Sequence, residues 1–263
     1  MSAAGPGDGR VAIVTAAAAG IGRAIAELWC RDGGSCVLAD TDAPGLEATV
    51  ADLTASGRRV SGVAGDVCRS DVAARVADRA RTGFGRVDAL FNVVGVNLAR
   101  NVEEISEEEW RSQLDANLGS VFQMSKPVIP LLREAGGGSI VNVASTAGIL
   151  AENRCSAYSA GKGGVILLTK NMALDFARDG IRVNAIAPGG TRTPRIERFL
   201  AEHPDHASMM ADTCAMQRFA RPEEIAAPAV FLASPDASFI TGAVLPVDGG
   251  MTAGVRFRAF EDM

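Results

Sequence analysis

The chain has 263 residues, of which 48% are hydrophobic and 22% are charged, and its formal net charge is −5. This is ordinary globular composition, which excludes a disordered or low-complexity chain. An acidic chain lacks the basic surface that attracts nucleic acid or an anionic membrane, so we expect neither of them as a partner. The chain also holds no apolar run of about 18 residues, so we expect no membrane-spanning helix.

The cysteine and histidine content predicts a cytoplasmic protein without a metal site. The five cysteines are scattered without a CxxC pair, and residues 1–10 lack the order of a signal peptide, which favours reduced thiols in the cytoplasm. The two histidines, His203 and His206, share a Pro-containing loop that offers no further zinc ligands.

Short apolar runs alternate with helical patterns along the chain. The predicted strands cover residues 11–15, 36–39, 60–64, 87–93, 140–144, 181–187 and 243–247. The predicted helices cover residues 23–31, 46–56, 70–82, 156–178 and 222–232, together with a long helix that opens at a Ser106–Glu109 capping box and carries Asn117.

This alternation predicts an α/β fold. Near-continuous apolar strands are buried on both faces, and strands that alternate with helices pair in parallel through right-handed crossovers. We therefore expect residues 1–263 to form a single-domain, doubly wound, Rossmann-type sheet of seven parallel strands with helices on both faces. Residues 189–221 break the alternation, and this irregular stretch predicts a lid or substrate loop.

A glycine-containing turn follows the first strand and leads into a helix. Its sequence is Thr15-Ala16-Ala17-Ala18-Ala19-Gly20-Ile21-Gly22, and such a position is where a helix N-terminus binds a pyrophosphate. Asp40 ends the second strand, where a carboxylate can accept both adenosine ribose hydroxyls and would repel a 2′-phosphate. No Arg or Lys lies in the turn or directly after Asp40, so we predict NAD rather than NADP as cofactor.

Two further strand ends lie at the same predicted edge. Asp66 and Val67 could contact the adenine, although an Asp that merely ends a strand is an equally good interpretation. Gly95 permits close approach of the backbone to a ribose, whereas Asn92 could equally be a structural cross-link between strands.

Ser145, Tyr158 and Lys162 form the strongest chemical pattern. Ser145 follows the fifth strand, and Tyr158 and Lys162 are four residues apart on one helix face. Tyr158 is the only tyrosine, and Lys162 is one of only three lysines. A free tyrosine has a pKa of about 10, and we expect the neighbouring ammonium and an oxidised nicotinamide to move that pKa toward the working pH.

With these motifs, the chain resembles the classical short-chain dehydrogenases/reductases, in their NAD-preferring branch, from about residue 9 to residue 250. The resemblance implies that Tyr158 is the acid/base, with Ser145 and Lys162 as partners, and that Asn117 supports a proton relay. It implies cofactor contacts from the segment 188–193, and it implies a homotetramer or homodimer. The cofactor set predicted on both grounds is Thr15, Ala19, Gly20, Ile21, Gly22, Asp40, Asp66, Val67, Asn92, Gly95, Tyr158, Lys162, Pro188, Gly189, Thr191 and Thr193.

The chain departs from the family pattern at two places. Ala16 stands where the turn usually has glycine, which costs about 1–2 kcal/mol if the position needs a positive φ. Val93 and Val94 replace Asn-Ala in the family's Asn-Asn-Ala-Gly motif, a change of packing rather than of chemistry.

We therefore expect an NAD-dependent oxidoreductase that interconverts a secondary alcohol and a ketone. Arg154, Arg192 and Arg195 are candidates to hold a substrate carboxylate, with Arg154 and Arg195 preferred, although pairing with Glu152 or Glu197 is the plainer interpretation. An apolar pocket for a cyclic alcohol is the other possibility, lined by Ile149, Leu150, Met209, Met210 and Met216. The alternatives are a 3-oxoacyl thioester reductase that uses NADPH and a redox-silent NAD-binding regulator.

Overall fold

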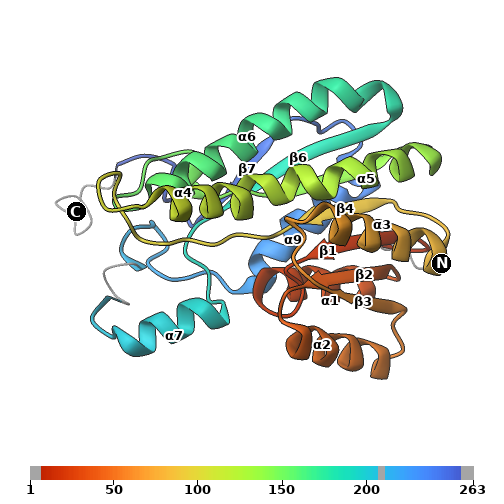
Figure 1. The fold of residues 1–263 in the computed structure, drawn as a ribbon, viewed down its shortest axis with the longest axis horizontal. Helices are drawn as coiled ribbons and strands as arrows, with labels where there is room; N and C mark the ends of the chain where they lie inside the picture. Colours follow the sequence, from red (N-terminus) through yellow and green to blue (C-terminus); the bar gives the residue numbers. More distant parts are fainter. Residues whose placement is uncertain (1–6, 207–210, 256–263) are drawn as a thin grey trace.

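The computed structural model of the protein describes residues 7–206 and 211–255, which form one seven-stranded parallel sheet (Figure 1). The strand order is β3-β2-β1-β4-β5-β6-β7, and every neighbouring pair is parallel. The strands are β1 (Val11–Thr15), β2 (Ser35–Asp40), β3 (Val60–Ala64), β4 (Ala89–Asn92), β5 (Gly138–Val143), β6 (Ile181–Pro188) and β7 (Val244–Val247). The predicted doubly wound α/β fold is confirmed.

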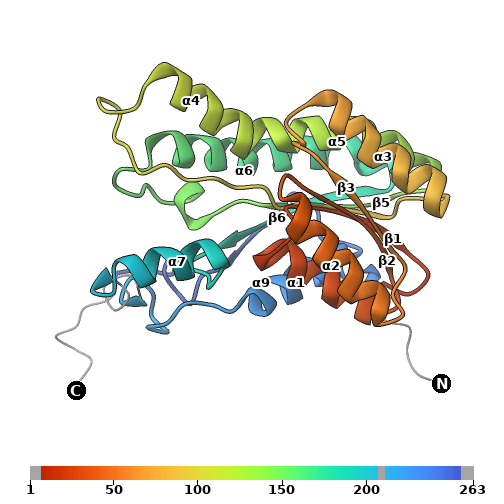
Figure 2. The same ribbon diagram turned by 60° about the horizontal axis from the view of Figure 1, so that its bottom comes forward.

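Helices cover both faces of the sheet, as Figure 2 shows from the side. One layer contains α1 (Gly20–Arg31), α2 (Ala43–Ala55) and α9 (Pro222–Ala233). The other contains α3 (Ser70–Phe84), α5 (Ser120–Glu134) and α6 (Ser156–Phe176), with α4 (Glu107–Leu114) leading into α5. The crossovers between parallel strands place successive helices in these layers, because each must return the chain to the starting edge of the sheet.

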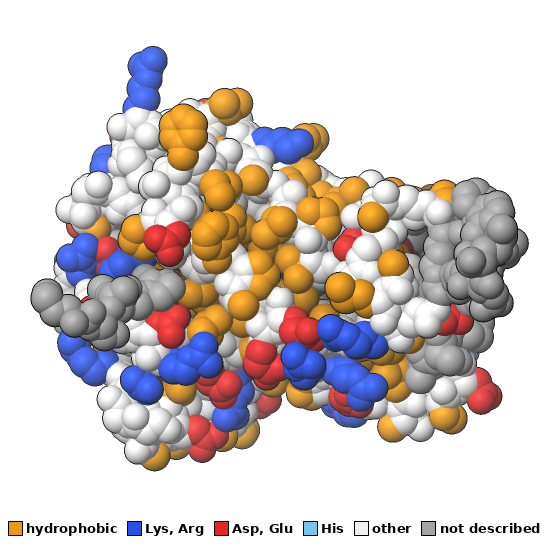
Figure 3. Space-filling view, turned by 180° about the vertical axis from the view of Figure 1, so that it is seen from behind, with side chains coloured by type: hydrophobic (Ala, Val, Ile, Leu, Met, Phe, Trp, Pro, Cys, Tyr) orange, Lys and Arg blue, Asp and Glu red, His pale blue; other side chains and the backbone are white. Residues whose placement is uncertain are grey.

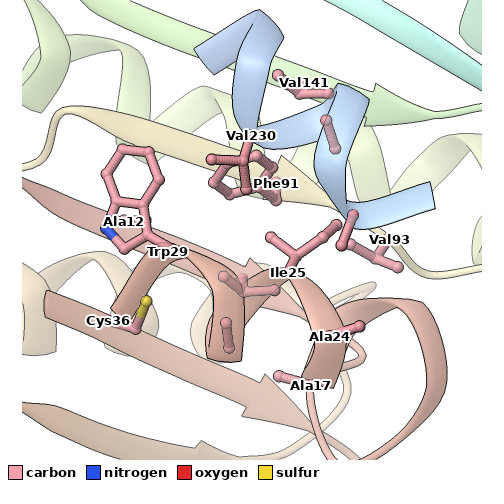
Figure 4. Packing of buried hydrophobic residues seen from close by; sticks show 14 of the residues in the cluster. Ala12, Ala17, Ala24, Ile25, Trp29, Cys36, Phe91, Val93, Val141 and Val230 are labelled. Carbon is pink, nitrogen blue, oxygen red and sulfur yellow. The ribbon is translucent and has the colours of Figure 1, made fainter. Parts of the chain in front are cut away.

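The two faces of the sheet bury separate apolar clusters, because alternate side chains of a strand point to opposite faces. In β1, Ala12 and Val14 belong to the α1 and α9 side, whereas Ile13 belongs to the α3, α5 and α6 side. On the first side, Trp29 of α1 packs edge-on against Phe91 of β4, with ring centroids 5.7 Å apart (Figure 4). All five residues of β1 are buried, which accounts for the continuous apolar pattern of that strand.

The structure differs from the sequence prediction in the segment 189–221. The prediction of an irregular stretch is wrong for α7 (Pro194–Glu202), a helix that begins with Thr193 as N-cap and Pro194 in the first turn. A parallel bridge between Thr191 and Ala220 brings the two ends of the segment together. The segment therefore leaves the sheet edge and returns to it at one place, and its role as a lid stays a prediction.

The long helix predicted around Asn117 is interrupted. The capping box of Ser106 and Glu109 opens α4 as predicted, but residues Asp115–Gly119 form a turn of π-helix before α5 begins. Turns of this kind occur frequently at functional sites.

Large apolar side chains are exposed on part of the surface. Hydrophobic side chains gather across the middle of the face opposite that of Figure 1 (Figure 3). Among the exposed large apolar residues are Phe231 of α9, Phe239, which follows that helix, and Leu245 of β7. In the described part of the chain, no helix has both the length and the apolar character needed to cross a bilayer.

Ala16 adopts a left-handed backbone conformation, with φ of 51°, so the departure from glycine carries strain. We expect Ala16→Gly to raise the free energy of unfolding by up to about 1 kcal/mol, because glycine removes the Cβ clash while adding some entropy to the unfolded chain. Urea unfolding of both proteins measures the difference.

The buried neighbour Ala17, which is not in the left-handed region, provides the control. Ala17→Gly should lower the free energy of unfolding by about 1–2 kcal/mol, because the unfolded chain gains entropy and a buried methyl group is lost without any relief of strain. Equal destabilisation by both substitutions would contradict the assignment of strain to Ala16.

Candidate active site

The predicted site residues meet at the carboxyl edge of the sheet, where the strand order reverses between β1 and β4. Thr15, the last residue of β1, joins the two strands: its hydroxyl donates to the Phe91 carbonyl at 3.3 Å and accepts from the Val93 N–H at 2.9 Å. Such a reversal leaves a crevice in which ligands of doubly wound sheets bind. The side chain of Thr15 is itself buried and serves this cross-link.

The turn after β1 is shaped by close backbone contacts. A Cβ on Gly22 would lie 2.1 Å from the Ala16 carbonyl oxygen, so only glycine fits there. Gly20 has φ of 55°, and a Cβ on it would lie 3.1 Å from the methyl carbon of Thr193. The glycine turn and the segment before α7 therefore face each other across a narrow gap.

The N-terminus of α1 fits the pyrophosphate of a dinucleotide. Ala19 is the N-cap residue and makes no side-chain cap bond, and the first turn holds no acidic residue. The first N–H groups of a helix lack partners within the helix, and the helix dipole places partial positive charge there. The backbone of Ala19, Gly20, Ile21 and Gly22 is thus the donor set that an anionic group needs.

Asp40 ties the end of β2 to this turn. One of its oxygens accepts from the Ala18 N–H at 2.9 Å and the other from the Asp42 N–H at 2.9 Å. A carboxylate has about four acceptor positions, so Asp40 retains capacity for ribose hydroxyls. With Asp42 beside it, the position presents two carboxylates and would repel a further phosphate.

The remaining strand ends separate into exposed and structural positions. Asp66 is exposed and accepts from the Cys68 N–H at 2.9 Å, whereas Val67 is buried. Asn92 is buried, and its amide donates to the Asn142 side chain at 2.9 Å. Asn92 therefore cross-links β4 and β5, which was one of the two interpretations left open by the sequence.

Ser145, Tyr158 and Lys162 are brought together between β5 and α6. The Ser145 side chain lies close enough to the Tyr158 phenol to lower its pKa, and the Ser145 Oγ accepts from the Ala147 N–H at 3.1 Å. The Lys162 Nζ lies 5.9 Å from the centroid of the Tyr158 ring. The spacing of four residues on α6 thus places phenol and ammonium on one face, as predicted.

The ammonium of Lys162 is almost wholly buried, at 1% exposed. Its Nζ donates to the Val143 carbonyl of β5 at 2.8 Å and to the Val94 carbonyl beyond β4 at 3.0 Å. A Cβ on Gly95 would lie 3.1 Å from this nitrogen, so the glycine provides the space for it. Burial lowers the pKa of Lys162 from its ordinary value of 10.5 to about 7.

Burial also raises the pKa of Tyr158 above its ordinary value of 10. The Ser145 side chain and the charge of Arg195 act in the opposite direction, while the charges of Glu152 and Cys155 raise the pKa further. The pKa of Tyr158 is therefore shifted upward in the protein by itself, and the expected lowering by the ammonium together with an oxidised nicotinamide stays a prediction. Desolvation of the phenolate outweighs the stabilising groups.

Asn117 lies in the π turn and is fully buried. Its amide nitrogen donates to the Val96 and Gln113 carbonyls at 2.7 and 2.8 Å, and its oxygen accepts from the Val96 N–H at 3.1 Å. The side chain thereby fixes the segment that carries Val94 and Gly95. A role in a proton relay stays a prediction.

The segment after β6 lies beside the glycine turn. Pro188 ends β6, and the Gly189 N–H donates to the Val247 carbonyl at 3.1 Å. Thr191 is buried, and its hydroxyl donates to the Gly189 carbonyl at 3.0 Å. Thr193 is partly buried, and its hydroxyl accepts from the Ile196 N–H at 3.4 Å as the N-cap of α7.

The candidate arginines differ in their partners. Arg154 forms two hydrogen bonds to Glu104, at 2.9 and 2.7 Å, so its charge is already matched by a carboxylate. Arg192 pairs with Glu197 at 3.2 Å. Arg195 instead donates to the Asn97 carbonyl.

Of the predicted apolar lining, Ile149, Leu150 and Met216 are exposed, while Met209 and Met210 lie outside the described residues.

Two groups that hold Lys162 were missed by the sequence reasoning, because both are backbone carbonyls. Val94 and Val143 stand in apolar strand patterns that carry no chemical signal. The Glu104 partner of Arg154 was also missed, because the two residues are 50 positions apart.

The chain matches known proteins over nearly its whole length. The family model described as "Enoyl-(Acyl carrier protein) reductase" matches residues 15–252. The chain is 40% identical to cis-4-hydroxycyclohexanecarboxylate dehydrogenase of Sinomonas cyclohexanicum, with 93% of this chain and 97% of that protein covered. It is 40% identical to D-threitol dehydrogenase of Mycolicibacterium smegmatis, with 93% and 94% covered.

A solved structure from Burkholderia xenovorans, assigned to the short-chain dehydrogenases/reductases, has the same fold. Its TM-score is 0.92 at 34% identity, and the match covers 96% of this chain and all of that one (100%).

The low pKa of Lys162 predicts a pH dependence of stability. Between about pH 7 and pH 10.5 the unfolded chain binds the lysine proton more tightly than the folded chain, so the contribution of Lys162 to stability increases with pH. From pH 7.5 to pH 9, the free energy of unfolding of the wild type should rise by about 1–2 kcal/mol relative to Lys162→Met. Urea unfolding at several pH values measures this.

Lys170→Met, at an exposed lysine of the same helix, is the matched control and should run parallel to the wild type. Parallel pH profiles for Lys162→Met and the wild type would contradict the depressed pKa.

Proposed function

The chain belongs to the short-chain dehydrogenase/reductase family, and from this premise we propose that it is an NAD-dependent oxidoreductase that interconverts a secondary alcohol and a ketone. The observation that carries the proposal is the contact of Ser145 with Tyr158 beside the buried Lys162. This group stands at the same sheet edge as a glycine turn that suits a dinucleotide.

In the direction of oxidation, the alcohol loses a hydride from its carbon and a proton from its oxygen. The bound nicotinamide supplies the hydride acceptor. Tyr158 takes the proton at its phenolic oxygen, and Ser145 holds the substrate oxygen beside that phenol. In reduction Tyr158 returns the proton, and the raised pKa of Tyr158 keeps the phenol protonated for this step at neutral pH.

Lys162 and Asn117 do not contact the reacting bond in this proposal, but they serve the proton transfer at Tyr158. With a pKa of about 7, Lys162 can gain or lose a proton near neutrality, which suits a relay that exchanges protons with Tyr158. Asn117 holds the Val96 backbone and so positions the Val94 carbonyl against the ammonium. We assign Asn117 this positioning role in the proposed relay.

The residues of the sheet edge would hold NAD along its length. The α1 N-terminus would bind the pyrophosphate, and Asp40 would accept from the adenosine ribose. Asp66 and Val67 would lie at the adenine, Gly95 and Lys162 at the nicotinamide ribose, and the segment from Pro188 to Thr193 at the nicotinamide. Thr15 and Asn92 support the site through their cross-links rather than by direct contact.

The names of the two relatives give two kinds of substrate, a cyclic hydroxy acid and a sugar alcohol, and each of these compounds contains a secondary alcohol. A relative from Thermotoga maritima that is 34% identical is named 3-oxoacyl-[acyl-carrier-protein] reductase, so a 3-oxoacyl thioester reductase is the second candidate. Asp40 and the net charge of −5 favour the first, because an NADPH-linked reductase of an acidic carrier would be served by basic residues at these positions.

We further propose a homotetramer or homodimer in the cytoplasm. Exposed apolar side chains of α9 and β7 support self-association, since contiguous apolar surface marks an interaction site.

Removal of the phenolic hydroxyl tests the proposed acid/base. Tyr158→Phe should lower kcat for alcohol oxidation by about 10²–10⁴-fold, because the substrate proton then loses its proposed acceptor. Absorbance of NADH in a panel of secondary alcohols measures the rate, and NADH fluorescence checks that cofactor binding persists. Turnover close to that of the wild type would overturn the mechanism.

Asp40→Asn tests the cofactor preference. The substitution keeps an acceptor for the Ala18 N–H but removes the negative charge, so the ratio of kcat/KM for NADP to that for NAD should rise about tenfold. Steady-state kinetics with both cofactors measure the ratio.

Glu47→Gln, at an exposed position of α2, changes net charge equally and should leave the ratio unaltered. A wild type that already prefers NADP would refute the assignment of NAD and favour the thioester reductase.

A further inference from the structure

Two unlike charges act on Tyr158 from separate elements. Glu152 comes from the loop between β5 and α6, and Arg195 from the first turn of α7. The charge of Glu152 raises the pKa of Tyr158 and that of Arg195 lowers it, so both lie within electrostatic reach of the phenol. Lys162 and Cys155 are the other titratable groups around it.

Neither charge is matched by an ion pair in the described part of the chain. The ion pairs nearest to them in sequence are those of Arg154 with Glu104 and of Arg192 with Glu197. Within residues 7–206 and 211–255, Arg195 donates to a backbone carbonyl, that of Asn97. Glu152 is partly buried and accepts from the Thr146 hydroxyl at 3.4 Å. Glu152 is thus held against Thr146, which follows Ser145, and Arg195 is held against Asn97. Asn97 in turn contacts Cys155, the N-cap of the helix that carries Tyr158.

The neighbourhood of Glu152 is polar as well. The Asn97 amide nitrogen contacts the Cys155 sulfur at 3.2 Å, and its oxygen is buried without a partner. The charge of Glu152 helps to raise the pKa of the Cys155 thiol, after the larger effect of burial. An apolar ring placed against these groups would desolvate them without replacing their hydrogen bonds, which is unfavourable.

We propose that Glu152 and Arg195 select polyhydroxylated secondary alcohols, Glu152 by accepting from one substrate hydroxyl and Arg195 by donating to another oxygen of the same molecule. A polyol satisfies both charges, because each hydroxyl donates and accepts. A monocarboxylate satisfies Arg195 but is repelled by Glu152, and a plain cycloalkanol satisfies neither. The inference rests on the proposed function and names its substrate class.

The test compares three substrates with NAD: D-threitol, cyclohexanol and cis-4-hydroxycyclohexanecarboxylate. We expect the wild type to have its highest kcat/KM on the polyol. In Glu152→Gln and in Arg195→Gln, KM for the polyol should rise at least about tenfold, because each variant loses one charged hydrogen bond to the substrate. KM for cyclohexanol should not rise in either variant.

The matched control is Arg198→Gln, which removes an exposed arginine of α7 that donates to the Pro194 carbonyl, and it should behave as the wild type. The pH profile of kcat is a second readout. Its midpoint should move to lower pH in Glu152→Gln and to higher pH in Arg195→Gln, because the two charges act on Tyr158 in opposite directions.

The outcomes separate the two proposals. A wild type that oxidises cyclohexanol or the hydroxy acid in preference to D-threitol overturns this inference and leaves the proposed function standing. An unchanged polyol KM in Glu152→Gln also overturns it. A wild type that oxidises none of the three with either NAD or NADP overturns the proposed function and this inference together.

Discussion

The burial of one ammonium group is the constraint on which the site depends. Lys162 reaches from α6 to the carbonyls at the ends of β4 and β5, and these two acceptors are what make a nearly inaccessible charge tolerable. Gly95 leaves room for it, and Asn117 fixes the backbone on which one carbonyl stands. Because a shift of either strand end would remove one of the two acceptors of this buried ammonium, the position of α6 is tightly determined. Tyr158 lies one turn earlier on the same helix, so the contacts that fix Lys162 also fix the position of the phenol.

In the protein without cofactor, the surroundings of Tyr158 favour the protonated phenol. Burial keeps Tyr158 protonated at neutral pH, which prepares it to donate, as reduction of a ketone requires. Oxidation requires loss of that proton, and the groups that promote it are Ser145 and Arg195, whereas Glu152 opposes it. Residues that face the substrate therefore also adjust the acid/base. A substitution of Glu152 or Arg195 that changes the substrate preference will therefore also change the pH dependence of turnover.

The sequence was sufficient for features that follow from local pattern. The strands, the two helix layers and the grouping of Ser145, Tyr158 and Lys162 rest on buried runs and on a spacing of four residues, which both act locally. It was insufficient where the partner is distant or is backbone. The pairing of Arg154 with Glu104 and the carbonyls that hold Lys162 leave no pattern in the chain. The helix α7 was missed although Thr193, Pro194 and Glu197 form a recognisable helix start, because the surrounding composition is that of a loop.

The strained turn and the acidic residue behind it form one unit. Asp40 accepts from the Ala18 N–H, the Ala17 N–H donates to the Ala39 carbonyl, and the Thr49 hydroxyl donates to the Ala18 carbonyl. These bonds hold the turn to β2 and α2 at successive residues, and such a surrounding network allows Ala16 to keep a conformation that an alanine disfavours. The carboxylate assigned to the adenosine ribose therefore also shapes the turn assigned to the pyrophosphate. A substitution at Asp40 that removes the acceptor for the Ala18 N–H would therefore change the phosphate site together with the cofactor preference, whereas Asp40→Asn keeps that acceptor and changes the charge.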